Sequence, residues 1–224
     1  MRTFLFLGLL SVPAISSAAN TYYYPEWFAM QTGIPGSMTG QIHIGPSKTI
    51  GISYSGNVIA ESQINDSGSY YYTAYNGGHN YYLNNEVGNA PTRKDIIALS
   101  GQTINLVKNT ITFSEPVKDP IMDIVSLGSP SQISNYDFDT PFTILSQGPG
   151  YWGSGSLWTP SANRLTGMEG DGVIQFTGLV TSISFYASPS EYWSGFNIGV
   201  VPEPSSLLAL GAGLGLLLRR RKRA

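Results

Sequence analysis

The side chains best suited to chemistry are carboxylates in the later part of the chain: Asp137, Asp139, Glu169, Asp171 and Glu191. Calcium binds several hard oxygen ligands, which the loops of secreted β-proteins can supply. Asp137, Asp139, Glu169 and Asp171 are therefore candidate Ca²⁺ ligands. Their spacing does not match an EF-hand, and capping of turns or exposure to solvent explains them more simply.

The same carboxylates raise the question of hydrolysis. A glycosidase needs two carboxyl groups facing each other across a cleft at a defined separation. The sequence does not fix any such separation, so a secreted hydrolase is an alternative and not the main prediction. We predict no catalytic residue.

Aromatic rings form a second set of candidates, because exposed rings can stack on sugars. The rings considered for this role are Tyr151, Trp152, Trp158 and Trp193. Runs such as Tyr22–Tyr24 and Tyr70–Tyr72 cannot face one core, since neighbouring residues of a strand point to opposite faces. Some of these rings must be exposed or lie on a second buried face. Core packing is the alternative role for most of them.

Other motifs predict no site. The absence of cysteine excludes thiol catalysis and Cys-ligated zinc. His43, in a predicted strand, and His79, in a predicted turn, have no partner at metal-ligand spacing. Gly148, Gly150 and Gly153 spell G-x-G-x-x-G, but the following residues cannot begin the helix that a dinucleotide site requires.

The elements that must position these residues are short strands. Ile183 and Phe185 alternate with Ser182 and Ser184, the period of a half-buried strand. Turn residues such as Asn76-Gly77-Gly78 and Asp171-Gly172 separate the strand-like runs. The predicted strands are Thr49–Tyr54, Ser69–Tyr75, Thr103–Val107, Thr110–Phe113, Phe142–Leu145, Gly172–Phe176, Thr181–Tyr186 and Tyr192–Val200. They predict an all-β, antiparallel sandwich or jelly-roll-like body over residues 20–200.

Charge limits the choice of partner. The 224-residue chain has a net charge of −2, but six of its twelve basic residues lie at its ends. Residues 20–201 hold thirteen acidic and six basic residues, a net charge of −7. An acidic body without a basic patch argues against nucleic acid as a partner.

Both ends of the chain look like targeting segments. A positive start, the apolar run Phe4–Leu10 and small residues before Ala18 and Ala19 predict a signal peptide over residues 1–19, cleaved after one of those alanines. The Sec translocon and signal peptidase are then expected partners. Near the other end, Leu207–Leu218 is a short apolar run for which we predict a membrane helix over about 205–218.

The last residues give that helix a direction. The basic cluster Arg219, Arg220, Arg221, Lys222 and Arg223 should stay cytoplasmic and stop translocation. The body before it would then lie outside, in agreement with the independent signal-peptide prediction. The two inferences together predict an exported protein.

Pro202, Glu203 and Pro204, the short Gly/Leu-rich run and the terminal basic cluster resemble, in that order, the PEP-CTERM sorting signal of Gram-negative bacteria. The resemblance covers residues 201–224. It implies processing near Pro-Glu-Pro by exosortase, a membrane-embedded cysteine protease. It also implies transient residence in the inner membrane, then the envelope, cell surface or extracellular matrix, often in bacteria that make exopolysaccharide.

A second resemblance covers residues 135–200. The segments Phe142–Ser146, Leu165–Gly170, Gly172–Gly178 and Glu191–Phe196 are similar to a recurrent extracellular module of PEP-CTERM-tailed proteins. That module implies no settled activity. We therefore predict a non-catalytic structural or adhesive body without a cofactor. A module binding the cell's own exopolysaccharide is the alternative.

Overall fold

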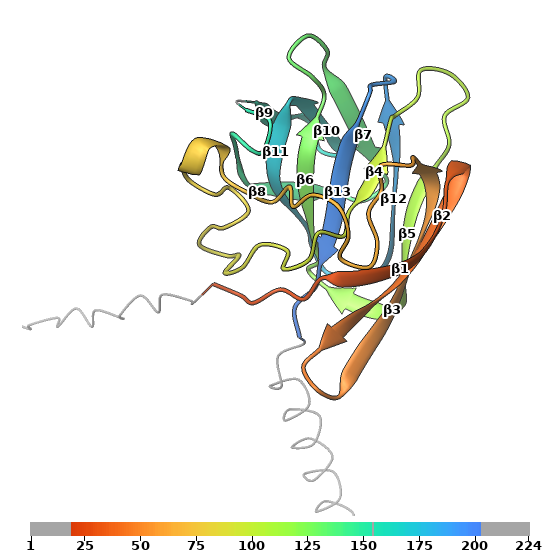
Figure 1. Ribbon diagram of the computed structural model, residues 1–224, viewed down its shortest axis with the longest axis vertical. Coiled ribbons are helices and arrows are strands. Elements are labelled where there is room, and N and C mark those ends of the chain that lie inside the picture. The colour runs from red at the N-terminus through yellow and green to blue at the C-terminus, as the bar shows by residue number, and fades with distance from the viewer. Residues whose placement is uncertain (1–18, 154, 203–224) are drawn as a thin grey trace, which may run out of the picture.

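The computed structural model describes residues 19–153 and 155–202, which fold into two packed antiparallel sheets (Figure 1). The eight-stranded sheet has the order β1-β2-β3-β5-β12-β7-β10-β9 and the five-stranded sheet the order β4-β13-β6-β11-β8. The predicted all-β sandwich is thereby confirmed. The strands are β1 (Pro25–Gln31), β2 (Gly33–Ile44), β3 (Lys48–Val58), β4 (Ile97–Leu99), β5 (Asn109–Lys118), β6 (Ile121–Leu127), β7 (Ser134–Phe138), β8 (Phe142–Gly148), β9 (Ser156–Ser161), β10 (Arg164–Met168), β11 (Gly170–Phe176), β12 (Leu179–Ser188) and β13 (Ser194–Gly199).

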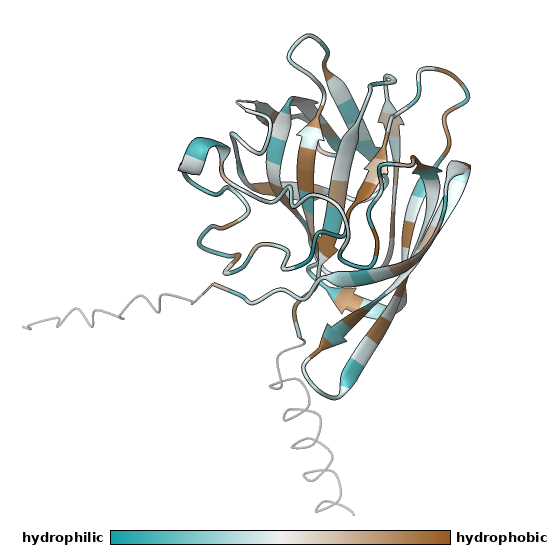
Figure 2. Ribbon diagram, in the orientation of Figure 1, coloured by the Kyte–Doolittle hydropathy of each residue, from teal (hydrophilic) through white to brown (hydrophobic). Residues whose placement is uncertain are grey.

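Alternation along the strands explains how the eight-stranded sheet forms. On β3, Ile50, Ile52 and Tyr54 are buried while the residues between them are partly or fully exposed. Figure 2 shows this as brown bands alternating with paler ones along the β2–β3 hairpin. Gly45 supports the hairpin turn with a φ of 61°, a conformation that glycine adopts without steric cost. One face of this sheet therefore packs inward and the other meets solvent.

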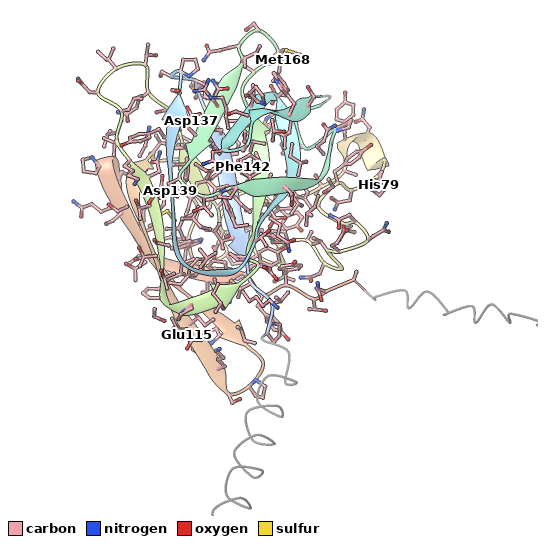
Figure 3. All side chains as sticks on the ribbon, turned by 180° about the vertical axis from the view of Figure 1, so that it is seen from behind. His79, Glu115, Asp137, Asp139, Phe142 and Met168 are labelled. Carbon is pink, nitrogen blue, oxygen red and sulfur yellow. The ribbon has the colours of Figure 1, made fainter. Side chains whose placement is uncertain are left out.

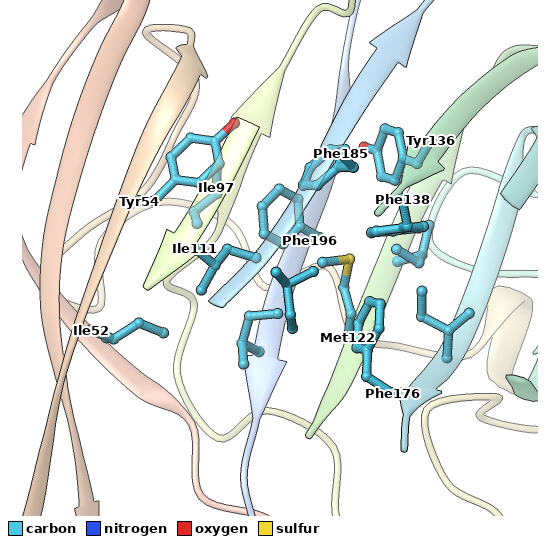
Figure 4. Packing of buried hydrophobic residues seen from close by; sticks show 14 of the residues in the cluster. Ile52, Tyr54, Ile97, Ile111, Met122, Tyr136, Phe138, Phe176, Phe185 and Phe196 are labelled. Carbon is cyan, nitrogen blue, oxygen red and sulfur yellow. The ribbon is translucent and has the colours of Figure 1, made fainter. Parts of the chain in front are cut away.

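The main core lies between the two sheets and is rich in aromatic rings. Phe196 of β13 makes edge contacts with Tyr54 of β3 and Phe185 of β12, at centroid distances of 5.7 and 5.6 Å. Tyr136 and Phe138 of β7 extend the cluster (Figure 4). Edge-to-face pairs of this kind add to the stabilisation from apolar burial. The core thus locks β13 against the larger sheet.

A long irregular segment, residues 59–96, covers the outer face of the five-stranded sheet (Figure 1, orange to yellow). Tyr72 and Tyr82 of this segment pack with Val125 of β6 and Val173 of β11 in a second hydrophobic cluster. The hydroxyls of these tyrosines donate to the carbonyl oxygens of Asp95 and Ile124. Four of the five strands of this sheet, all except the edge strand β8, are therefore buried on both faces. Of the two alternatives left open for the tyrosine runs, exposure or a second buried face, Tyr22, Tyr24 and Tyr72 take the second.

Two of the predicted strands are wrong. Ser69–Tyr75 belongs to the covering segment, where the hydroxyls of Tyr70 and Tyr72 bond to backbone carbonyls and no strand forms. Thr103–Val107 is a loop in which the side chain of Ile104 is 75% exposed. The other six predicted strands overlap observed ones, and His43 lies on β2 as expected.

The two ends of the body meet at one point. Tyr23 and Val200 exchange two backbone hydrogen bonds, of 2.8 and 3.0 Å. The predicted signal peptide, apart from Ala19, and the sorting residues from Glu203 onward lie outside the described residues. Within the described part of the chain, no helix has the length and apolarity needed to cross a membrane.

Candidate functional site

A pocket of ≈ 480 Å³ opens at the end of the five-stranded sheet where β6 ends and β13 begins. Its volume lies within the range of roughly 300–1,000 Å³ that is usual for small-molecule sites. Loops that are far apart in the sequence meet there because antiparallel strands bring alternate connections to one edge. The lining residues are Glu61, Tyr71, Ser126, Gly128, Ser129, Trp152, Glu169, Glu191, Tyr192 and Trp193.

Three aromatic rings form one wall of the pocket, and each of them contacts the other two. Trp152 stacks on Tyr71 with ring centroids 4.9 Å apart and 24° between the planes. Trp193 lies 4.8 Å from Trp152 and 5.3 Å from Tyr71. Tyr151 packs edge-on against Tyr71 and Trp152 from outside the lining. Trp152 remains 45% exposed, so this wall offers ring surface to a ligand.

Carboxylates line the same pocket. Glu169 lies between β10 and β11, and its Oε1 accepts a hydrogen bond of 2.5 Å from the hydroxyl of Ser126. Ser126 and Glu169 both have left-handed backbone conformations, with φ of 54° and 53°. Non-glycine residues in that region cost about 1–3 kcal/mol each and cluster at functional sites. The rest of the fold holds Glu169 in place despite this cost.

Glu191 is the most buried carboxyl group of the lining. Burial raises its pKa to about 8, and the negative charge of Glu169 acts in the same direction. The hydroxyl of Ser194 and the N–H of Gly128 oppose this shift of the pKa. Its Oε2 is buried without a hydrogen-bond partner among the described residues. An unsatisfied buried oxygen is costly, so it is available to a ligand that can donate to it.

Gly128 is required where it is. Its φ of 79° favours glycine, and a Cβ there would come within 2.4 Å of the carbonyl oxygen of Gly167. The chain that leaves β6 can therefore pass close to Gly167 of β10 only because position 128 has no side chain.

Asp171 supports the site from beneath. Its Oδ1 lies 3.0 Å from the hydroxyl of Tyr82 and accepts a 3.1 Å hydrogen bond from the N–H of Ser126. Burial raises the pKa of Asp171 to about 7, and these two donors oppose that shift. Asp171 thus connects the covering segment to the residue that orients Glu169.

The structure separates the four candidate calcium ligands. Asp137, on β7, forms a bidentate ion pair with Arg164, and Asp139 pairs with Lys108. Figure 3 shows Asp137 and Asp139 on the far side of the molecule from His79. Glu169 borders the pocket, whereas Asp171 lies buried under it. Residues 19–153 and 155–202 contain no group of three or more His, Cys, Asp or Glu side chains that could hold a metal ion.

The aromatic candidates divide in a similar way. Tyr151, Trp152 and Trp193 come together, whereas Trp158 lies on edge strand β9, outside the pocket. His79 contacts Tyr81 and is also absent from the lining. Sequence reasoning missed Glu61, Ser126 and Ser129, which stand in no motif. Nothing in the sequence around Ser126 indicates that its backbone is left-handed.

The C-terminal end of the chain is the part that matches a known family model. The body ends with the buried Val200 paired to Tyr23, and then brings Val201 and Pro202 to its surface. Residues 200–222 match the PEP-CTERM protein-sorting motif. The motif implies an exported protein that exosortase sorts and processes. No curated protein and no solved structure matches the chain.

Proposed function

We propose that this exported protein uses its β-sandwich as a non-catalytic, adhesive module that binds glycans of the cell envelope or matrix. The observation that carries the proposal is the wall of Tyr71, Trp152 and Trp193 beside polar side chains in one pocket. Flat rings cover the apolar faces of a sugar, and carboxylates and hydroxyls accept or donate hydrogen bonds to its hydroxyl groups.

The sorting motif supports this role. A protein released to the surface by its tail meets the polysaccharides of the envelope there. A pocket at the opposite end of β13 from that tail would remain accessible to them.

A glycan array with the full-length protein tests the proposal. The detergent should be of the polyoxyethylene type, because maltoside detergents would themselves compete for a sugar pocket. We expect binding that falls by about tenfold or more in Trp152→Ala, since one lost stacking contact is worth on the order of 1.4 kcal/mol. Trp158→Ala, an exposed tryptophan outside the pocket, is the matched control. Equal losses in both variants, or no bound glycan, would refute the proposal.

A secreted hydrolase is the second candidate, and one observation favours it. Glu169 and Glu191 line the same pocket, and the raised pKa of Glu191 suits a general acid. Prolonged incubation with the bound oligosaccharides, followed by mass spectrometry, separates the two candidates. The binding proposal expects intact oligosaccharides. Shortened products that disappear with Glu191→Gln would establish the hydrolase instead.

A further inference from the structure

The pocket is negative and has no compensating charge in its lining. Three of its lining residues are glutamates, Glu61, Glu169 and Glu191, and none is Lys, Arg or His. None of the three glutamates forms an ion pair with another described residue. Basic side chains elsewhere pair with other carboxylates, such as Lys48 with Glu115. A ligand rich in uronic acid, sulfate or phosphate would meet repulsion here.

The aromatic wall adds attraction for the opposite charge. The face of a tryptophan or tyrosine ring carries negative electrostatic potential and attracts a cation within about 6 Å of its centroid. Aromatic rings beside carboxylates are the usual surroundings of a bound organic ammonium group. In this pocket, Trp152, Trp193 and Tyr71 stand beside Glu169 and Glu191.

The acidic side chains of the pocket suit an organic cation better than a metal ion. Within the described ranges no three acidic side chains lie close enough together to hold a metal. The pocket volume of ≈ 480 Å³ suits a group of several atoms, such as a sugar ring with a substituent. The buried Oε2 of Glu191, which lacks a protein donor, can accept a hydrogen bond from an ammonium group.

We infer that the pocket selects an ammonium-bearing glycan, meaning a polysaccharide with free amino sugars, over neutral and acidic ones. This inference rests on the proposed glycan binding and specifies the ligand class. The ring stacks on Trp152 while its ammonium group lies between Glu169 and Glu191. N-acetylation of the amino group removes the charge and with it the preference.

Calorimetry on the full-length protein with three probes tests the inference. The probes are a glucosamine tetramer with free amino groups, its fully N-acetylated counterpart, and choline. At a pH of about 6.5, amino groups of ordinary pKa, about 7.7–8 for an α-amine, are largely protonated. Glu191, with its pKa of about 8, is mostly neutral in the free protein at this pH, so an ammonium group that binds beside it expels its proton. Phosphocholine and maltoside detergents are avoided because their headgroups would compete. We expect the free tetramer to bind at least about tenfold more tightly than the acetylated one.

Matched variants assign the preference to the carboxylates. Glu191→Gln and Glu169→Gln should reduce the preference to about threefold or less without weakening the acetylated tetramer. Glu61 is exposed, so Glu61→Gln should fold even if a buried variant folds poorly. It should also reduce the preference for the free tetramer, and so provides a second test. Glu86→Gln, exposed and outside the lining, should keep the full preference.

The outcomes separate the two proposals. If the acetylated tetramer binds as tightly as the free one, ammonium selection is refuted and glycan binding stands. If only choline binds, ammonium selection is supported and glycan binding is refuted. If none of the probes binds, the inference is wrong, and a neutral or acidic glycan found by the array would still uphold the proposed function.

Discussion

The hydroxyl of Ser126 donates to Oε1 of Glu169 at 2.5 Å, and both residues have left-handed backbone conformations. This hydrogen bond joins the end of β6 to the turn between β10 and β11. Ser126→Ala removes the bond without changing the backbone. Because a hydrogen bond contributes about 1 kcal/mol, we expect binding of the free glucosamine tetramer to weaken about fivefold, measured by calorimetry.

Ser129→Ala is the control for this prediction. Ser129 lines the same pocket but makes no side-chain hydrogen bond to another described residue. Its replacement should leave affinity within about twofold, the scatter expected of a surface change. If both variants bind like the native protein, Ser126 does not position Glu169 for the ligand.

Binding of a permanently charged ligand should depend on pH through Glu191. A cation favours the carboxylate over the carboxylic acid, so binding expels the proton of Glu191. Affinity for a trimethylated glucosamine oligomer should therefore rise as pH increases from about 6 to 9, with a midpoint near the pKa of about 8. Calorimetry in buffers of different ionisation enthalpy measures the released proton.

Variants of the neighbouring acids test the same prediction. Glu191→Gln should give a flat pH profile. Glu169→Gln should lower the midpoint, because the charge of Glu169 is one cause of the raised pKa of Glu191. Glu61 also faces the pocket, and its variant should weaken binding at every pH. An unchanged slope in Glu191→Gln would assign the titration to another group.

The buried acid Asp123 should make the protein less stable at high pH. It is fully buried on β6 beside Tyr24, and burial raises its pKa well above the ordinary value of 3.8. The folded state then holds the proton more tightly than the unfolded chain does. Stability should fall as pH rises from about 4 toward the raised pKa. Asp171, with a pKa of about 7, contributes in the same direction.

Asp123→Asn should remove much of this dependence. At pH 8 we expect the variant to exceed the native protein by about 2 kcal/mol or more in the free energy of unfolding, since it buries no charge. Urea unfolding at about pH 5 and pH 8 measures both effects. Asp139→Asn, at an exposed ion pair, should change stability by less than about 1 kcal/mol. A native protein more stable at pH 8 would contradict the argument.

Glu203 should matter for removal of the tail. It stands between Pro202 and Pro204, and since proline disfavours a helix we expect this stretch to take an extended form that a protease can bind. Glu203→Ala should therefore leave membrane insertion intact and slow tail removal in a host with exosortase. Pulse-labelled protein recovered with an antibody to the body gives the rate. Maturation of the variant at the native rate would show that Glu203 is not recognised.

The sequence predicts best where one physical signal dominates. On β12, Ile183 and Phe185 are buried while Ser182 is exposed, as the alternation predicted. Ser184 departs from the pattern because it is buried and bonded to Thr110 and Asp139. The fully buried strand β6 was not predicted, since a strand covered on both faces shows no alternation.

Single residues of the site could be predicted from the sequence, but their arrangement in space could not. Trp152 and Trp193 were recognised as candidate stacking residues, but nothing local indicates that they would meet Tyr71 in space. The tyrosine-rich segment around Tyr72 has the residue preferences of a strand and instead covers a sheet. Long-range packing decided both outcomes, and it leaves no periodic trace in a single sequence.

The direction of β13 places the pocket and the tail at opposite ends of one strand. Trp193 stands directly before this strand and Val200 directly after it, so its six residues separate pocket and tail by about 20 Å. A chain still held by its tail would turn the pocket away from the lipid, toward polymers outside. The pocket could then bind such a polymer before the tail is cut. Cutting the tail would change only whether the captured polymer stays fixed to the cell or can be carried away from it.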